Sequence, residues 1–207
     1  MTNLIEKCAS GIVKWCFRDE TKVSNEQKEI LIYGYTLLLE NVYKTIILLI
    51  IALFTGTLWE TLLIIGSFVL LRCFSGGIHC RSSLGCTLGM IGVWVVGLIV
   101  SRIELPLIVL IMMGIIIVWT VLRYAPQSTG NNPIQNKKVW QQKRIGSLVV
   151  MALLLIVGMV CGLLLNRPEI LNMILTSLYI EAFSILLLVE KEERNNEELE
   201  ESYRKAW

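Results

Sequence analysis

The sequence predicts an all-α fold: a polytopic membrane helix bundle of about six transmembrane helices with an amphipathic interfacial helix at the N-terminus. Hydrophobic residues make up 55% of the 207 residues, and the mean hydropathy is +0.64. Apolar runs that approach the roughly 17–25 residues needed to cross a bilayer recur along the chain. A soluble domain would need a largely polar surface, which this composition does not supply. We therefore expect an integral membrane protein embedded in a lipid bilayer.

The first twenty residues predict the amphipathic helix. Apolar side chains recur on one face at helical spacing, and basic side chains lie off that face. The apolar face holds Leu4, Ile5, Cys8, Ile12, Trp15 and Cys16, and the basic residues are Lys7, Lys14 and Arg18. This pattern is typical of a helix that lies in the membrane interface. A cytoplasmic helix packed on the rest of the protein fits the pattern equally well. We expect no cleavable signal peptide, because no continuous apolar core precedes residue 30.

Six candidate spans follow, and turn-forming residues separate several of them. Gly56, Pro106 and Pro168 lie at or near their ends. The spans cover residues 32–55, 58–74, 84–100, 105–122, 145–165 and 170–189. No internal repeat is visible, so residues 1–207 are predicted to form a single membrane domain. Its parts would be a cytoplasmic amphipathic segment (1–30), a transmembrane bundle (31–189) and a charged cytoplasmic tail (190–207).

The distribution of lysine and arginine predicts the orientation of the bundle. One set of connections and both termini hold almost all of these residues: Lys7, Lys14, Arg18, Lys22, Lys28, Arg72, Arg81, Arg123, Lys137, Lys138, Lys143, Arg144, Lys191, Arg194, Arg204 and Lys205. The opposite side holds only Arg102 and Arg167. Because cytoplasmic loops are enriched in basic residues, both termini and the connection after the second span should be cytoplasmic.

That connection contains the chain's one histidine, His79, in the stretch GGIHCRSSLGC that ends at Cys86. A nucleophilic cysteine needs a base to accept its proton or a positive environment to stabilise its thiolate. Seven residues of continuous helix would hold the two side chains about 10.5 Å apart, too far for direct proton transfer. The backbone between them must therefore bend, and the freedom to do so is supplied by Gly76, Gly77, Ser82, Ser83 and Gly85. Ser82 or Ser83 could cap the third span, which would place Cys86 in its first turn.

Other functions of these residues stay open at this point. Cys73, His79, Cys80 and Cys86 could together ligate a metal, although their spacing lacks the usual paired arrangement. They could also simply pack inside a non-enzymatic membrane protein, such as a small transporter or a metal-binding subunit. The six cysteines show no disulfide-framework spacing, so we expect reduced thiols. The net charge of +2 gives no indication of a nucleic-acid partner.

Two motifs resemble a known family. The stretch RCFSGGIHCRSSLGC, residues 72–86, is similar to the signature of the accessory gene regulator B (AgrB) family, and YAPQSTGNNPI, residues 124–134, resembles a second family pattern. The resemblance extends over essentially the whole chain. Members of that family are membrane cysteine endopeptidases that process quorum-sensing propeptides in Gram-positive bacteria. The resemblance therefore implies a multi-pass protein of the bacterial cell membrane, a propeptide substrate like that of the family (AgrD-like) and no cofactor; a homodimer is left open.

The resemblance also implies roles for single residues. Cys86 matches the family's nucleophile, His79 its catalytic partner, and Arg72 the arginine that precedes the double glycine. The implied reaction is cleavage of the propeptide's C-terminal tail through an acyl-enzyme thioester, followed by cyclisation to a thiolactone or lactone. Cys80 departs from the family pattern, although Cys86 has the matching position.

Residues outside the motifs are interpreted from the sequence alone. Lys137 and Lys138 could attract an acidic propeptide tail, although positive-inside sorting explains these charges equally well. Glu181 lies in the middle of the sixth span without a local partner, which predicts either substrate binding or a buried interhelical contact. Glu40 and Lys44 are four residues apart, and we expect them to neutralise each other, with a substrate contact as the alternative.

Overall fold

The computed structural model describes residues 2–16, 25–77, 83–127 and 136–206. These residues form helices and no strand: α1 (Thr2–Cys16), α2 (Asn25–Thr55), α3 (Leu58–Ser75), α4 (Ser83–Ser101), α5 (Leu107–Tyr124), α6 (Lys137–Met159), the π-helical turn η1 (Val160–Leu164) and α7 (Pro168–Ala206). The all-α prediction is confirmed. The chain divides into two compact units, Met1–Gly56 and Thr57–Trp207.

Six of the helices are long and apolar enough to cross a membrane. Within the described residues these candidate spans are Lys28–Thr55, Leu58–Ser75, Leu84–Ser101, Leu107–Tyr124, Lys137–Leu164 and Pro168–Lys191. Many of their large apolar side chains are exposed, among them Leu88, Ile99, Leu107 and Leu163. A soluble monomer rarely exposes so much apolar surface, so this exterior fits lipid. The predicted number of spans is confirmed, and their ends are shifted by up to eight residues, the most at the start of the fifth span.

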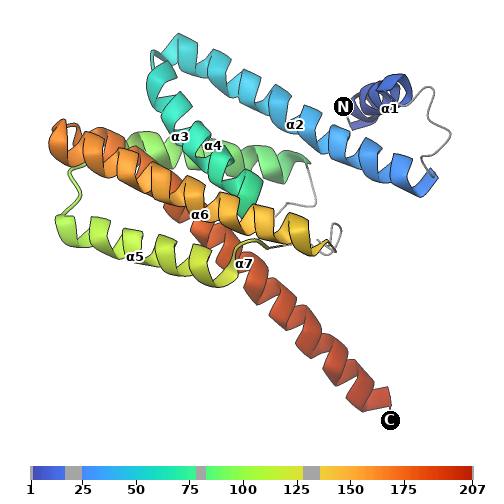
Figure 1. Ribbon diagram of the computed structural model, residues 1–207. Coiled ribbons are helices and arrows are strands. Elements are labelled where there is room, and N and C mark those ends of the chain that lie inside the picture. Colours follow the sequence, from blue (N-terminus) through green and yellow to red (C-terminus); the bar gives the residue numbers. More distant parts are fainter. Residues whose placement is uncertain (1, 17–24, 78–82, 128–135, 207) are drawn as a thin grey trace. The chain divides into compact units, whose positions relative to one another are not determined.

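The first unit consists of α1 and α2, which pack against each other (Figure 1). Ala9 and Val13 of α1 are buried, whereas Cys8 and Trp15 of the predicted apolar face are exposed. The predicted N-terminal helix therefore exists, and its location at a membrane interface stays a prediction. In α2, Lys44 Nζ lies 3.2 Å from Glu40 Oε2 and both side chains are largely buried, so the expected mutual neutralisation is confirmed.

The second unit is organised around α7, which contacts α3, α4, α5 and α6 (Figure 1). Leu178, Ala182 and Ile185 of α7 are fully buried, and Leu71 of α3 and Ile117 of α5 belong to the same core. The most buried of the candidate spans is thus the last one in the sequence.

Small residues let α7 approach its neighbour closely. A Cβ atom at Gly158 would lie 3.2 Å from Leu171 Cδ1, and one at Gly162 would lie 2.7 Å from Leu171 Cβ. Glycines four residues apart on a membrane helix are a common device for close helix packing, because they remove the side chains that would separate two backbones. The contact fixes η1 and the end of α6 against the start of α7.

The connections of the second unit lie at two ends. At one end, Arg102 and Arg167 line the same pocket together with Trp59, Glu60, Ser101, Glu169, Ile170 and Met173. At the other end, the backbone N–H of Gln127, after α5, donates to the carbonyl of Ser75, the last residue of α3, at 2.9 Å. The sequence assigned the first group of connections to the outside and the second to the cytoplasm. The structure agrees that these groups are separate.

Cysteine labelling tests which end is cytoplasmic. Two variants are compared, each with a single cysteine: one keeps only Cys86, and the other has Glu104→Cys and no native cysteine. A membrane-impermeant maleimide should label the Glu104→Cys variant in intact cells, and it should label Cys86 only after permeabilisation. The reason is that the loops at the Cys86 end of the bundle carry most of the lysines and arginines, and loops of this kind are retained in the cytoplasm. Labelling of Cys86 from outside intact cells would reverse the predicted orientation.

Candidate functional site

Cys86 lies in the first turn of α4, because that helix begins at Ser83. The expected position of this thiol at a helix N-terminus is thus found. The side chain is half-buried and its sulfur is not in a disulfide. The first backbone N–H groups of a helix lack intrahelical partners, and they favour negative charge nearby. Cys86 therefore lies at the end of α4 where the helix dipole is positive.

His79 and Cys80 lie outside the described residues. The described chain reaches Gly77 on one side of them and resumes at Ser83 on the other. Their distances from Cys86 are thus not part of the structure, and the predicted His79–Cys86 pair stays a prediction. No cluster of three or more metal-ligating side chains occurs among the residues that are described.

Gly76 and Gly77 end α3 in conformations that other residues rarely adopt. Gly76 has φ 76° and ψ −153°, and Gly77 has φ 139°. A Cβ atom on Gly76 would lie 2.2 Å from the carbonyl oxygen of Gln127. Backbone of this kind is essentially restricted to glycine. The turn at Gly76 packs directly on Gln127 of the second motif. The predicted bend between His79 and Cys86 falls largely on residues outside the described part of the chain, and it stays a prediction.

Arg72 lies in the last turn of α3 and forms an ion pair with Glu181 of α7. Arg72 Nη1 is 2.8 Å from Glu181 Oε2 and 3.2 Å from Ser184 Oγ. The Ser75 hydroxyl donates to Glu181 Oε1 at 3.2 Å. The guanidinium also lies over the ring of Phe68, 5.4 Å from its centre. Both carboxylate oxygens of Glu181 thus have hydrogen-bond partners within the bundle.

This ion pair changes the interpretation of two predicted residues. The Glu181 side chain is fully buried and forms the interhelical contact that was one of its two predicted roles. Arg72, the arginine that precedes the double glycine of the motif, pairs its charge with Glu181. Removal of one partner from a buried ion pair typically costs about 3–5 kcal/mol. The pair therefore ties the end of α3 to α7.

Three side chains of this region were not found by sequence reasoning. Ser75 lies inside the first motif, and Ser184 follows Glu181 by one helical turn. Both are uncharged, so residue type alone does not mark them as part of a site. Arg144 of α6 donates to the carbonyls of Ala125 at 3.1 Å and Leu122 at 3.2 Å, and so fixes the C-terminal end of α5. It was counted only among the loop charges.

Lys137 and Lys138 lie exposed in the first turn of α6. That helix is capped by Asn136, whose side-chain oxygen accepts a hydrogen bond from the Lys138 backbone N–H at 2.9 Å. Arg144, two helical turns later in α6, reaches the carbonyls of Leu122 and Ala125, so the lysines at the start of α6 lie at the same end of the bundle as the end of α5. Their exposed ammonium groups remain available to an acidic ligand.

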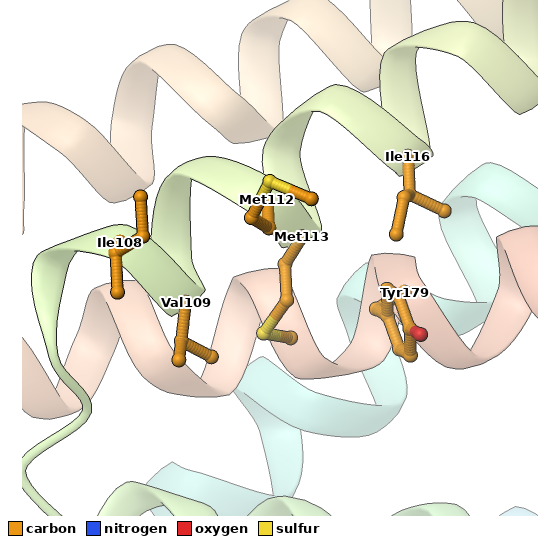
Figure 2. A pocket seen from close by; sticks show the side chains of 6 residues that line it. All are labelled: Ile108, Val109, Met112, Met113, Ile116 and Tyr179. Atoms are coloured by element: carbon orange, nitrogen blue, oxygen red, sulfur yellow. The ribbon is translucent and has the colours of Figure 1, made fainter.

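An apolar groove of about 240 Å³ lies elsewhere, between α5 and α7 (Figure 2). It is lined by Ile108, Val109, Met112, Met113, Ile116 and Tyr179. Figure 2 shows the methionine and isoleucine side chains of α5 along the groove, with Tyr179 of α7 as its one polar lining residue. None of the predicted site residues lines it, and its lining suits a lipid chain better than a reaction centre.

Comparisons with known proteins identify relatives over most of the chain. The family described as Accessory gene regulator B matches residues 5–185. An AgrB-like protein of Clostridium perfringens (strain SM101) is 31% identical over 146 residues, which are 67% of this chain and 68% of the relative. Accessory gene regulator protein B of Staphylococcus aureus (strain MW2) is 30% identical over 125 residues, 60% of this chain and 66% of that protein. Protein FsrB of Enterococcus faecalis is 29% identical over 157 residues, which are 74% of this chain and 62% of that protein. No solved structure matches the chain.

Proposed function

The chain belongs to the AgrB (accessory gene regulator B) family, and we propose on this basis that it is a membrane-embedded cysteine endopeptidase that matures a quorum-sensing propeptide. Membership supports a role in an accessory gene regulator system. The observation that carries the enzymatic proposal is the place of Cys86: a free, half-buried thiol in the first turn of α4, just beyond the segment with the only histidine.

In the proposed first step, His79 accepts the thiol proton of Cys86. The resulting thiolate attacks a peptide carbonyl carbon of the AgrD-like propeptide. The carbon–nitrogen bond breaks, and the imidazolium of His79 returns its proton to the departing amine of the C-terminal tail. The leader and central part of the propeptide remain attached to Cys86 as a thioester.

In the second step, a cysteine or serine of the bound propeptide attacks the thioester carbonyl. His79 accepts the proton of the attacking thiol or hydroxyl, the carbon–sulfur bond to Cys86 breaks, and the proton passes from His79 to the departing Cys86 thiolate. The product is a cyclic thiolactone or lactone. Thioester exchange is nearly balanced in energy, whereas hydrolysis is strongly downhill, so water must be kept from the acyl-enzyme. A site at the end of an apolar bundle, in the cell membrane and facing the cytoplasm, suits that requirement.

Lys137 and Lys138 are proposed to attract the acidic tail of the propeptide. Both side chains are exposed at the start of α6, on the end of the bundle that carries the two motifs. Exposed charges steer an oppositely charged partner more than they hold it, so this attraction should weaken as salt screens it.

Inhibition of the reconstituted protein tests the proposal. Liposomes carrying the purified chain should release the tail from a synthetic propeptide encoded by a small reading frame beside the gene, as followed by mass spectrometry. N-ethylmaleimide should abolish release because it consumes the nucleophile, whereas a metal chelator should have no effect. Release that survives alkylation but stops with the chelator would refute a thiol mechanism.

A further inference from the structure

We propose that α7 positions the catalytic segment through a buried latch formed by Arg72, Ser75, Glu181 and Ser184, against which Gly77 packs. This inference rests on the proposed function. It makes Glu181 and Gly77 positioning residues, which act on the reaction through the chain that they hold and do not touch the substrate.

The first argument is the charge balance of the latch. Glu181 is a fully buried carboxylate whose two oxygens receive hydrogen bonds from Arg72, Ser75 and Ser184. A buried charge persists only when it is paired and hydrogen-bonded. The guanidinium of Arg72 compensates the charge of Glu181 and so joins α3 to α7.

The second argument is the close approach of Gly77. A Cβ atom at this position would lie 2.7 Å from Ser184 Oγ, 2.8 Å from Glu181 Oε1 and 3.0 Å from Arg72 Nη1. Its φ of 139° is also unfavourable for other residues. The backbone at Gly77 therefore rests directly on the polar atoms of the latch, and any side chain would push the two apart.

The third argument is a second anchor on the same turn. The carbonyl of Ser75, a member of the latch, accepts a hydrogen bond from the backbone N–H of Gln127. The carbonyl of Gln127 in turn lies so close to Gly76 that a Cβ atom at position 76 would clash with it. Arg144 holds the preceding residues Leu122 and Ala125. The chain that leaves α3 is thus fixed from two sides, and the two motifs found in the sequence meet at one turn.

The position of this turn decides what it can control. His79 follows Gly77 by two residues, and the helix that carries Cys86 begins six residues after Gly77. A displacement of about 1 Å at a reacting group can cost on the order of 100-fold in rate. A latch that fixes the origin of the His79 segment would therefore set how well the imidazole meets the thiol.

A double-mutant cycle between positions 77 and 79 tests this proposal. The readout is the rate at which N-ethylmaleimide alkylates Cys86 in liposomes, in a chain where it is the only cysteine. His79→Ala should slow alkylation by about 10–100-fold in the otherwise native chain, which lies within the range of coupling between groups in contact. In the Gly77→Ala chain, alkylation should already be slow, and His79→Ala should change it by less than about twofold.

Matched variants separate positioning from general loosening. Gly89→Ala in α4 adds a Cβ that meets nothing within 4 Å, and Gly97→Ala adds one that meets Ile64 at 2.8 Å. Both should keep the full effect of His79→Ala, even if Gly97→Ala lowers thermal stability. Ser184→Ala should reduce the His79 effect, whereas Ser177→Ala should not, because that hydroxyl only donates to Met173 of its own helix.

The outcomes distinguish the two proposals. If His79→Ala has no effect in the otherwise native chain, the proposed catalytic pair fails. If His79→Ala has its full effect in both the native and the Gly77→Ala chains, the pair stands and the latch is overturned. If the Gly77→Ala chain fails to fold, the Ser184→Ala chain takes its place: an undiminished effect of His79→Ala in that chain would overturn the latch.

Discussion

Cys86→Ser is expected to abolish propeptide cleavage, whereas Cys80→Ser should leave most of it intact. Cys86 is in the first turn of α4, at the positive end of the helix dipole, and it is the proposed nucleophile. Serine keeps the size of the side chain, but its hydroxyl is a far weaker nucleophile in a site built for a thiolate. Cys80 directly follows His79, and neighbouring side chains diverge on an extended backbone. Release of the C-terminal tail by each purified variant in liposomes measures the difference.

Cys161→Ser is the matched control for the two cysteine variants. Cys161 is also a free, half-buried thiol, and it lies in η1, at the opposite end of α6 from the lysines that follow the second motif. Its replacement should leave cleavage unchanged. Full cleavage by Cys86→Ser, or loss of cleavage in Cys80→Ser alone, would assign the reaction to a different thiol.

His79→Ala is expected to lower the rate of cleavage by about 10²–10⁴-fold, the usual contribution of a general base. The chain contains no other histidine that could replace it. Membrane insertion and thermal stability should remain close to those of the native chain. The rates are compared with excess propeptide over the liposome-bound variants. Near-native cleavage by a well-inserted His79→Ala protein would give the imidazole a structural role.

The spans could be predicted from the sequence because apolar length reports directly on crossing a bilayer. Their ends could not. The fifth span was placed at residues 145–165, whereas α6 already begins at Lys137. Helical hydrogen bonding continues through the polar first turns, which apolar length does not register. In the same way α7 continues past residue 189 to Ala206.

The site was predictable residue by residue but not as an arrangement. Arg72 was singled out by its motif and Glu181 as an ionisable group within an apolar span. Their pairing joins residues 109 positions apart. It depends on which faces of α3 and α7 meet, and no periodicity within one helix contains that information. Ser184 and Gln127 contribute through their places in the fold, so residue type alone could not reveal them.

Mass spectrometry of the trapped acyl-enzyme tests the central claim most directly. The purified chain is mixed with propeptide whose internal cysteine or serine is replaced by alanine, which removes the group that would close the ring and release Cys86. The protein is quenched in acid, digested and mapped. The account predicts a thioester between Cys86 and the propeptide fragment that remains after loss of its tail. An acyl adduct on Cys80, or efficient tail release with no adduct on any cysteine, would contradict it.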